Sequence, residues 1–232
     1  MSFADRAVAY YRSLDSHWEV PDEIRILRPY DEAPILDLVA QVFHRYFDDD
    51  AIRIGVFGIN PGRFGAGRTG VAFTDPIRLK SELGIANDLP RRPELSSAFV
   101  YEAIRAFGGP TLFFRSFFLT ALCPLGFVKD GKNFNFCDDP ALFEQVEPRI
   151  VESLEAQIAL GLTRRVAICL GKGRNFEHFQ QLNARHRHFE RIEPLPHPRW
   201  VLQYRRRQKS RFLDQYVECL RGAESDLAGN RD

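Results

Sequence analysis

The sequence has few cysteines, few lysines and no long apolar run. Its four cysteines, at positions 123, 137, 169 and 219, form no Cys-x-x-Cys pair, and their spacing suits neither a zinc site nor an iron–sulfur cluster. We therefore expect reduced cysteines in or near the core of a cytoplasmic protein. No stretch approaches the ~20 apolar residues that span a bilayer, and the N-terminus has no apolar signal core. We predict no membrane partner, no metal and no cofactor.

Charge is distributed unevenly along the 232 residues. The formal net charge is only +1, but residues 1–50 carry eleven acids and five bases, whereas residues 194–213 carry six bases and no acid. Trp200 and Tyr204 lie among those bases, and arginines interleaved with aromatic rings are typical of nucleic-acid binding. The structural alternative is a solvated helix face.

Four short apolar segments alternate with helical patterns along the chain. Strands are predicted at residues 52–57, 115–122, 165–170 and 189–195. Helices are predicted at 4–13, 34–46, 76–83, 95–107, 139–160, 175–182 and 208–221. This alternation predicts an α/β domain over residues 1–222, with a mostly parallel sheet and helices on both faces, followed by a disordered tail at 223–232. Because ligands bind beyond the carboxyl ends of such strands, we expect the chemistry in the loops 58–73, 123–127 and 196–200.

The loop 58–73 reads GINPGRFGAGRTGVAF and contains a literal G-x-G-x-x-G at positions 65–70. A dinucleotide site requires that motif directly after a strand, with a second strand and an acid about 20 residues on, so we reject that interpretation. Asn60 lies just beyond the first predicted strand, where its amide can orient a water or read a base edge. A turn residue bonded to its own backbone is an equal alternative. Phe73 can stack on a base or pack in the core.

The loop 196–200 confines His197 between two prolines, each of which fixes φ near about −65°. A rigid histidine at a strand end can donate a hydrogen bond to a developing anion, and a structural loop histidine is the alternative. Lys172 and Arg174 stand at a predicted helix start, where they suit phosphate. His186 and His188 form a His-x-His pair, but no carboxylate or cysteine at a useful spacing completes a set, so we predict no metal there.

Together, the three loops resemble those of the uracil-DNA glycosylase superfamily, and specifically its single-strand-selective monofunctional branch with bacterial relatives. The first motif is matched by residues 58–62, 64–65, 69–71 and 73, the middle segment by 122–125 and the second catalytic motif by 195–198. Order and spacing agree over about residues 50–220, so the resemblance covers most of the chain.

The resemblance implies a three-layer α/β/α sandwich with a four-stranded, mostly parallel central sheet. It implies a monomeric enzyme of the bacterial cytosol or nucleoid that starts base excision repair on single-stranded or mispaired DNA. Uracil would be the substrate base, with deaminated purines as further candidates. Asn60 would position the attacking water, and His197 would stabilise negative charge on the departing base.

Further site residues follow from the same resemblance. The base would be bound by Gly58, Ile59, Gly62, Phe73, Thr120 and Ala121, with Phe73 stacking on the ring and Gly62 leaving space beside it. The candidates for DNA contacts are Arg199, Trp200, Arg205, Arg206, Arg207, Lys209, Lys172 and Arg174.

The chemistry fits these residue types. The sugar becomes oxocarbenium-like as the glycosidic bond lengthens, so the water needs positioning more than strong deprotonation. The motif loops contain no lysine that could form a Schiff base, and we predict hydrolysis without strand cleavage.

The sequence departs from the family pattern at two places. The asparagine that often reads the uracil edge is replaced by Ala121, with Thr120 beside it. The wedge that enters DNA is not matched residue for residue, and Arg199 and Trp200 are the candidates. The alternative function is therefore a catalytically weak protein that recognises damaged or abasic DNA; an enzyme acting on free nucleosides fits the basic 194–213 stretch less well.

Overall fold

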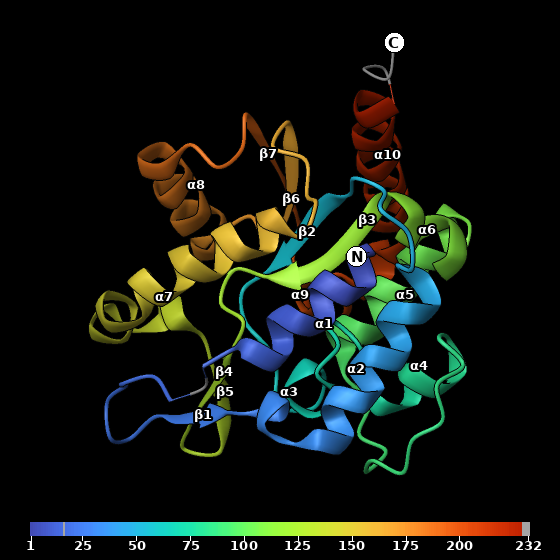
Figure 1. Ribbon diagram of the computed structural model, residues 1–232. Coiled ribbons are helices and arrows are strands. Elements are labelled where there is room, and N and C mark those ends of the chain that lie inside the picture. Colours follow the sequence, from blue (N-terminus) through green and yellow to red (C-terminus); the bar gives the residue numbers. More distant parts are fainter. Residues whose placement is uncertain (16, 229–232) are drawn as a thin grey trace.

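The computed structural model describes residues 1–15 and 17–228, and its centre is a four-stranded parallel sheet (Figure 1). The strands are β2 (Ile54–Gly58), β3 (Phe117–Ala121), β6 (Val166–Leu170) and β7 (Arg191–Leu195), in the order β3-β2-β6-β7. β2 and β6, the two central strands, are buried along their whole length, as expected for strands covered on both faces. The predicted α/β class and the four-stranded sheet are confirmed.

Helices cover both faces of this sheet and complete the three layers (Figure 1). One face packs against α1 (Phe3–Ser13), α2 (Ala33–Tyr46), α7 (Pro140–Ala159) and α8 (Arg174–His186). On this side the ring centres of Phe118 and Phe3 lie 5.1 Å apart, and those of Phe57 and Phe179 lie 5.2 Å apart. The other face packs against α5 (Leu95–Phe107), α6 (Pro110–Ser116) and α10 (Lys209–Ala228). Successive residues of each strand therefore serve opposite layers.

A second, antiparallel sheet was not predicted. It consists of β1 (Arg25–Leu27), β4 (Gly126–Lys129) and β5 (Lys132–Phe134), in the order β1-β4-β5. The turn between β4 and β5 is Asp130-Gly131, and both residues have positive φ, 51° and 68°. Asp-Gly between short strand-like runs is a hairpin signature. The expectation of a plain loop at 123–127 is therefore wrong at its carboxyl end, where β4 begins.

Three helical segments also differ from the sequence prediction. α6 takes residues 115 and 116 from the predicted second strand, because Pro110 starts a helix directly after two glycines. Residues 198–204 form a helix, α9 (Pro198–Tyr204), rather than a loop, and His197 is its N-cap. α10 continues to Ala228, so the predicted tail is helical from 223 to 228; residues 229–232 lie outside the described residues. Buried Ala223 and the Ser116–Glu224 hydrogen bond hold this end against α6.

The remaining short helices, α3 (Ala66–Thr69) and α4 (Pro76–Ser81), follow the glycine-rich loop. The four cysteines are free, and three of them are buried. Among the residues described, no helix combines the length and the apolar character that crossing a bilayer requires.

Candidate active site

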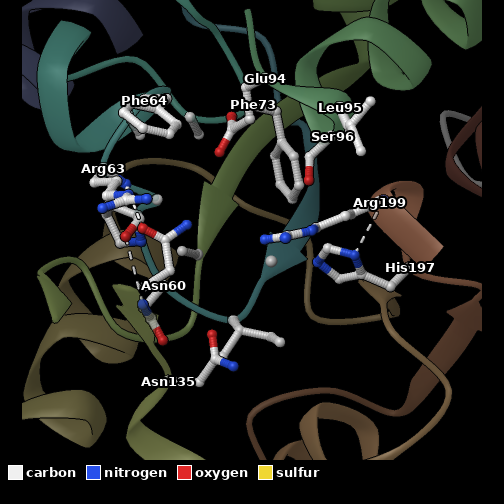
Figure 2. Close-up of a pocket in the computed structure, with 18 of the residues that line it drawn as sticks. Asn60, Arg63, Phe64, Phe73, Glu94, Leu95, Ser96, Asn135, His197 and Arg199 are labelled. Carbon is white, nitrogen blue, oxygen red and sulfur yellow. Dashed lines mark hydrogen bonds between the residues drawn. The ribbon is translucent and has the colours of Figure 1, made fainter. Parts of the chain in front are cut away.

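A cavity of about 650 Å³ opens at the carboxyl ends of β2, β3 and β7 (Figure 2). Its lining includes ten of the predicted site residues: Gly58, Ile59, Asn60, Gly62, Phe73, Thr120, Ala121, His197, Arg199 and Trp200. They come from segments up to 142 positions apart, and the parallel sheet brings them together because its strands end at one edge.

The side-chain amide of Asn60 is held by partners distant in sequence. Its Nδ2 donates to the carbonyl oxygen of Phe134 at 3.3 Å, and its Oδ1 accepts from the backbone N–H of Phe136 at 3.3 Å. The contact with its own neighbour, the Pro61 carbonyl, is the longest, at 3.4 Å. The amide is thus oriented by β5 and the residues after it, and its oxygen keeps one lone pair for a water.

His197 faces the cavity as a neutral hydrogen-bond donor. Its Nδ1 accepts the backbone N–H of Arg199 at 3.2 Å, so the proton of the neutral ring is on Nε2. Burial and the nearby Arg199 charge lower the pKa of His197 to about 4. The backbone before it is fixed by the Tyr216 hydroxyl, which donates to the Pro196 carbonyl. Near neutral pH this group can therefore donate a hydrogen bond to a developing anion without itself carrying charge.

Phe73 presents its ring to the cavity instead of packing fully in the core (Figure 2). Its backbone has a φ of 53°, a left-handed conformation that is uncommon for a phenylalanine. The turn before it is fixed because the Thr69 hydroxyl donates to the Thr74 carbonyl at 2.7 Å and the Tyr30 hydroxyl donates to the Gly70 carbonyl at 3.0 Å. The strained backbone thus presents an aromatic platform from a rigid loop.

Thr120 and Ala121 face opposite layers. The Thr120 hydroxyl donates to Gln157 of α7, and the residue is only 2% exposed. Ala121 is the register partner of Gly58, which lies under the Phe73 ring. The Thr120 hydroxyl therefore docks α7 on β3 although the residue also lines the cavity, and Ala121 shares the sheet face of the aromatic platform.

Glu94 is a cavity residue that the sequence analysis missed. It precedes α5, and its carboxyl lies against the glycine-rich loop: a Cβ at Gly62 or Gly65 would come within 2.5 or 2.1 Å of its oxygens. Gly62 thus makes room for this carboxyl. Burial, reinforced by the Asp75 charge and opposed by Arg199, raises the pKa of Glu94 to about 7. Nothing in the local sequence distinguishes this glutamate from a surface residue at a helix start.

The β4–β5 hairpin supplies a further wall of the cavity that was missed. Lys132, Asn133 and Asn135 line it, and the Asn133 Oδ1 accepts the backbone N–H of Arg63 at 3.0 Å. The Asp130-Gly131 turn was the available signal for this hairpin.

Arg199 and Trp200 lie differently at the mouth of the cavity. The Arg199 guanidinium extends into the cavity beside Phe73, whereas the Trp200 ring is 38% exposed and meets Phe212 edge-on (Figure 2). Tyr204, 59% exposed, lines the same side of the cavity. Both candidates for the wedge therefore lie at the mouth of the cavity, and both are exposed.

The other predicted DNA contacts lie outside the cavity lining. Arg205, Arg206, Arg207, Lys172 and Arg174 are exposed, and Lys209 is half-buried. The Arg205 guanidinium lies 4.9 Å from the centre of the Trp200 ring, which extends the basic surface from the cavity rim. The Lys209 ammonium is paired with Glu102 at 2.6 Å, and Arg174 lies 3.8 Å from Asp138. Lys209 and Arg174 are therefore less available to bind phosphate than the sequence suggested.

Comparisons with known proteins agree with this geometry. The sequence profile of the Uracil DNA glycosylase superfamily matches residues 44–221. The single-strand selective monofunctional uracil-DNA glycosylases of Rattus norvegicus and Mus musculus are 35% and 33% identical over 102 residues. Those matches cover 36% of this chain and only 37% of each relative.

A solved structure matches almost the whole chain. The crystal structure of wild-type Pedobacter heparinus SMUG2 superimposes with a TM-score of 0.93 at 36% identity, covering 97% of this chain and 99% of that one. The profile match, which spans most of the sequence, and the placement of Asn60 and His197 in one cavity lead to the same assignment. The chain belongs to the uracil-DNA glycosylase superfamily.

Proposed function

We propose that the protein is a monofunctional DNA glycosylase that hydrolyses the N-glycosidic bond of uracil in DNA and so begins base excision repair. The observation that carries the proposal is the pairing of an oriented amide, Asn60, with a neutral histidine donor, His197, in one cavity beneath an aromatic platform. The names of the two mammalian relatives, single-strand selective monofunctional uracil-DNA glycosylases, support the same reaction.

The reaction requires a base turned out of the helix and seated against Phe73. The glycosidic bond then lengthens, positive charge spreads over the sugar, and the base takes the bonding electrons. His197 Nε2–H stabilises the resulting anion, an interaction worth about 3 kcal/mol in comparable sites. The Asn60 Oδ1 orients a water that adds to the sugar carbon, and the proton released by that water leaves with the base or to solvent.

A strand-cleaving step is not part of the proposal. Lys132 lines the cavity, although the motif loops themselves hold no lysine. Its side chain is exposed, whereas lysines that form Schiff bases are usually desolvated. Trapping with borohydride should therefore yield no covalent protein–DNA adduct.

The substrate range extends to deaminated purines in this proposal, because Ala121 offers a methyl group where an amide would select the uracil edge. Single-stranded and mispaired sites are favoured, because unpairing the base costs least there. We further propose that the protein acts as a monomer.

The test is a cleavage assay on labelled oligonucleotides that carry one uracil, hypoxanthine or xanthine, single-stranded and duplex, with alkali added after incubation. We expect alkali-dependent cleavage at uracil, reduced about 100-fold or more in Asn60→Ala and in His197→Ala, with DNA affinity largely retained. His44→Ala, an exposed position on α2, is the matched control. Tight binding to abasic DNA with no cleavage of any base by the unmodified protein would instead support the damage-recognition function.

A further inference from the structure

Glu155, His186 and His188 form a cluster at the opposite end of β7 from His197. Glu155 belongs to α7, His186 is the last residue of α8, and His188 lies in the segment that leads into β7. One ligand atom from each residue lies within 4.8 Å of the others. The sequence expectation that no carboxylate completes a set with the two histidines is therefore wrong, because the fold supplies Glu155 from a helix about thirty residues earlier.

The imidazole of His188 is buried with unsatisfied hydrogen-bonding groups, as expected of a metal ligand without its ion. The His188 side chain is 1% exposed, and within residues 1–15 and 17–228 neither ring nitrogen has a hydrogen-bond partner. Its Nε2 lies 3.6 Å from the Glu155 carboxylate, beyond hydrogen-bond range. Since an imidazole always carries at least one N–H, this burial leaves a donor without a partner in the described part of the chain, which is unfavourable. A water or an ion bound to the ring nitrogens would satisfy such a group.

The local backbone places the two imidazoles side by side. Arg187, between them, has a left-handed φ of 53° and turns the chain as it leaves α8. The rings of His186 and His188 are consequently parallel, 6° apart, with their centres 5.4 Å apart. His188 is fixed from behind, because the Arg164 Nε donates to its carbonyl oxygen at 3.1 Å.

We propose that Glu155, His186 and His188 bind one first-row divalent transition metal ion, with Zn²⁺ the best fit. Two imidazoles and one carboxylate are a typical Zn²⁺ donor set, and water would complete four-coordination. Tetrahedral ligands at about 2.0–2.2 Å from the ion lie about 3.4 Å from one another. The exposed side chains of Glu155 and His186 can close that gap by rotation while the buried His188 stays in place.

The ion would have a structural role. It would join α7 to the end of α8 and to the start of β7, the strand whose other end carries His197. The site lies outside the lining of the catalytic cavity, so the proposed glycosidic hydrolysis does not depend on it.

The test uses the untagged full chain, stripped with chelator and titrated with Zn²⁺ in a calorimeter. We expect one ion per chain, and a rise in the melting temperature with Zn²⁺ because the ion binds the folded state. His186→Ala and Glu155→Gln alter exposed side chains and should each weaken Zn²⁺ binding at least 10-fold. His44→Ala is the matched control, because His44 also faces a carboxylate, Asp48, at 3.9 Å but belongs to no three-residue donor group among the described residues.

Co²⁺ substitution provides a second measurement that reports on geometry. A tetrahedral site should give visible absorption that is absent in His186→Ala. Absence of stoichiometric binding in the unmodified chain, or equal binding in His186→Ala and His44→Ala, would overturn the proposal. Either outcome leaves the glycosylase assay unaffected, so failure of this inference and failure of the proposed function are distinguishable.

Discussion

The ring of Phe73 occupies the space that a side chain at Gly58 would need. A Cβ at residue 58 would lie 2.6 Å from Cζ and 2.9 Å from Cε2 of this ring. The position of the Phe73 ring therefore depends on the absence of a side chain at Gly58, the last residue of β2.

Gly58→Ala should displace the Phe73 ring and lower kcat/KM for uracil excision at least about 10-fold, because misplacement by an ångström is costly in a preorganised site. The free energy of unfolding should fall by about 1–3 kcal/mol from overpacking. Gly222→Ala on α10, where a Cβ would meet no described residue within 4 Å, is the control and should keep full activity. Steady-state excision kinetics and urea unfolding measure both effects; unchanged kinetics in Gly58→Ala would contradict the role given to Gly58 and Phe73.

His197 should remain neutral throughout the physiological range. Its pKa of about 4 means that NMR of ¹⁵N-histidine-labelled protein should show the Nε2–H tautomer at pH 7 and no titration of this ring between pH 5.5 and 8. A titration midpoint of His197 near 6.5 would contradict the lowered pKa and the constant neutral state assigned to this ring.

Glu94→Gln should make stability less dependent on pH. The folded-state pKa of Glu94 is raised from 4.5 to about 7, so between these values the folded chain holds a proton that the unfolded chain releases. This contribution to stability is complete below pH 4.5 and is lost as the pH rises through 7. The variant should therefore gain stability relative to the unmodified protein as the pH rises, by up to about 3 kcal/mol at pH 8.

Urea unfolding at pH 5 and pH 8 measures this difference. Glu144→Gln, at an exposed position of α7, is the control and should give the same small change at both values. A Glu94→Gln effect that is equal at the two pH values would show that the carboxyl titrates normally.

DNA binding should depend on salt through the exposed arginines beside the cavity. The affinity constant K for DNA falls as the salt concentration rises, so the slope of log K against log[salt] is negative. Arg206→Ala and Arg207→Ala should each make this slope less steep, by about 0.7 for a single strand. Lys209→Ala should change the slope less, because its ammonium is paired with Glu102 at 2.6 Å. Fluorescence anisotropy of a labelled single-stranded oligonucleotide over a range of NaCl concentrations measures the slopes. An effect of Lys209→Ala as large as that of Arg206→Ala would contradict this assignment.

The sequence by itself determined the central sheet and the two motif loops. Buried parallel strands are continuous apolar runs, and glycine and proline mark the turns after them, so both signals are local and survive without tertiary context. Asn60 could be selected for the same reason, since it comes two residues after the buried strand β2. His197 could be selected because two prolines confine it just beyond the end of β7, although that strand is only partly buried. The β4–β5 hairpin had an equally local signal in Asp130-Gly131.

Tertiary structure alone decided which neighbours these residues meet. Thr120 turns to α7 while Ala121 lies beside Gly58, because successive strand residues face opposite layers and only packing determines which layer lies over the site. Glu94 becomes a half-buried carboxyl through contact with a glycine loop some thirty residues earlier, and Glu155 joins two histidines through the docking of separate helices. Burial and proximity of this kind are properties of the folded chain, and no local pattern of residues encodes them.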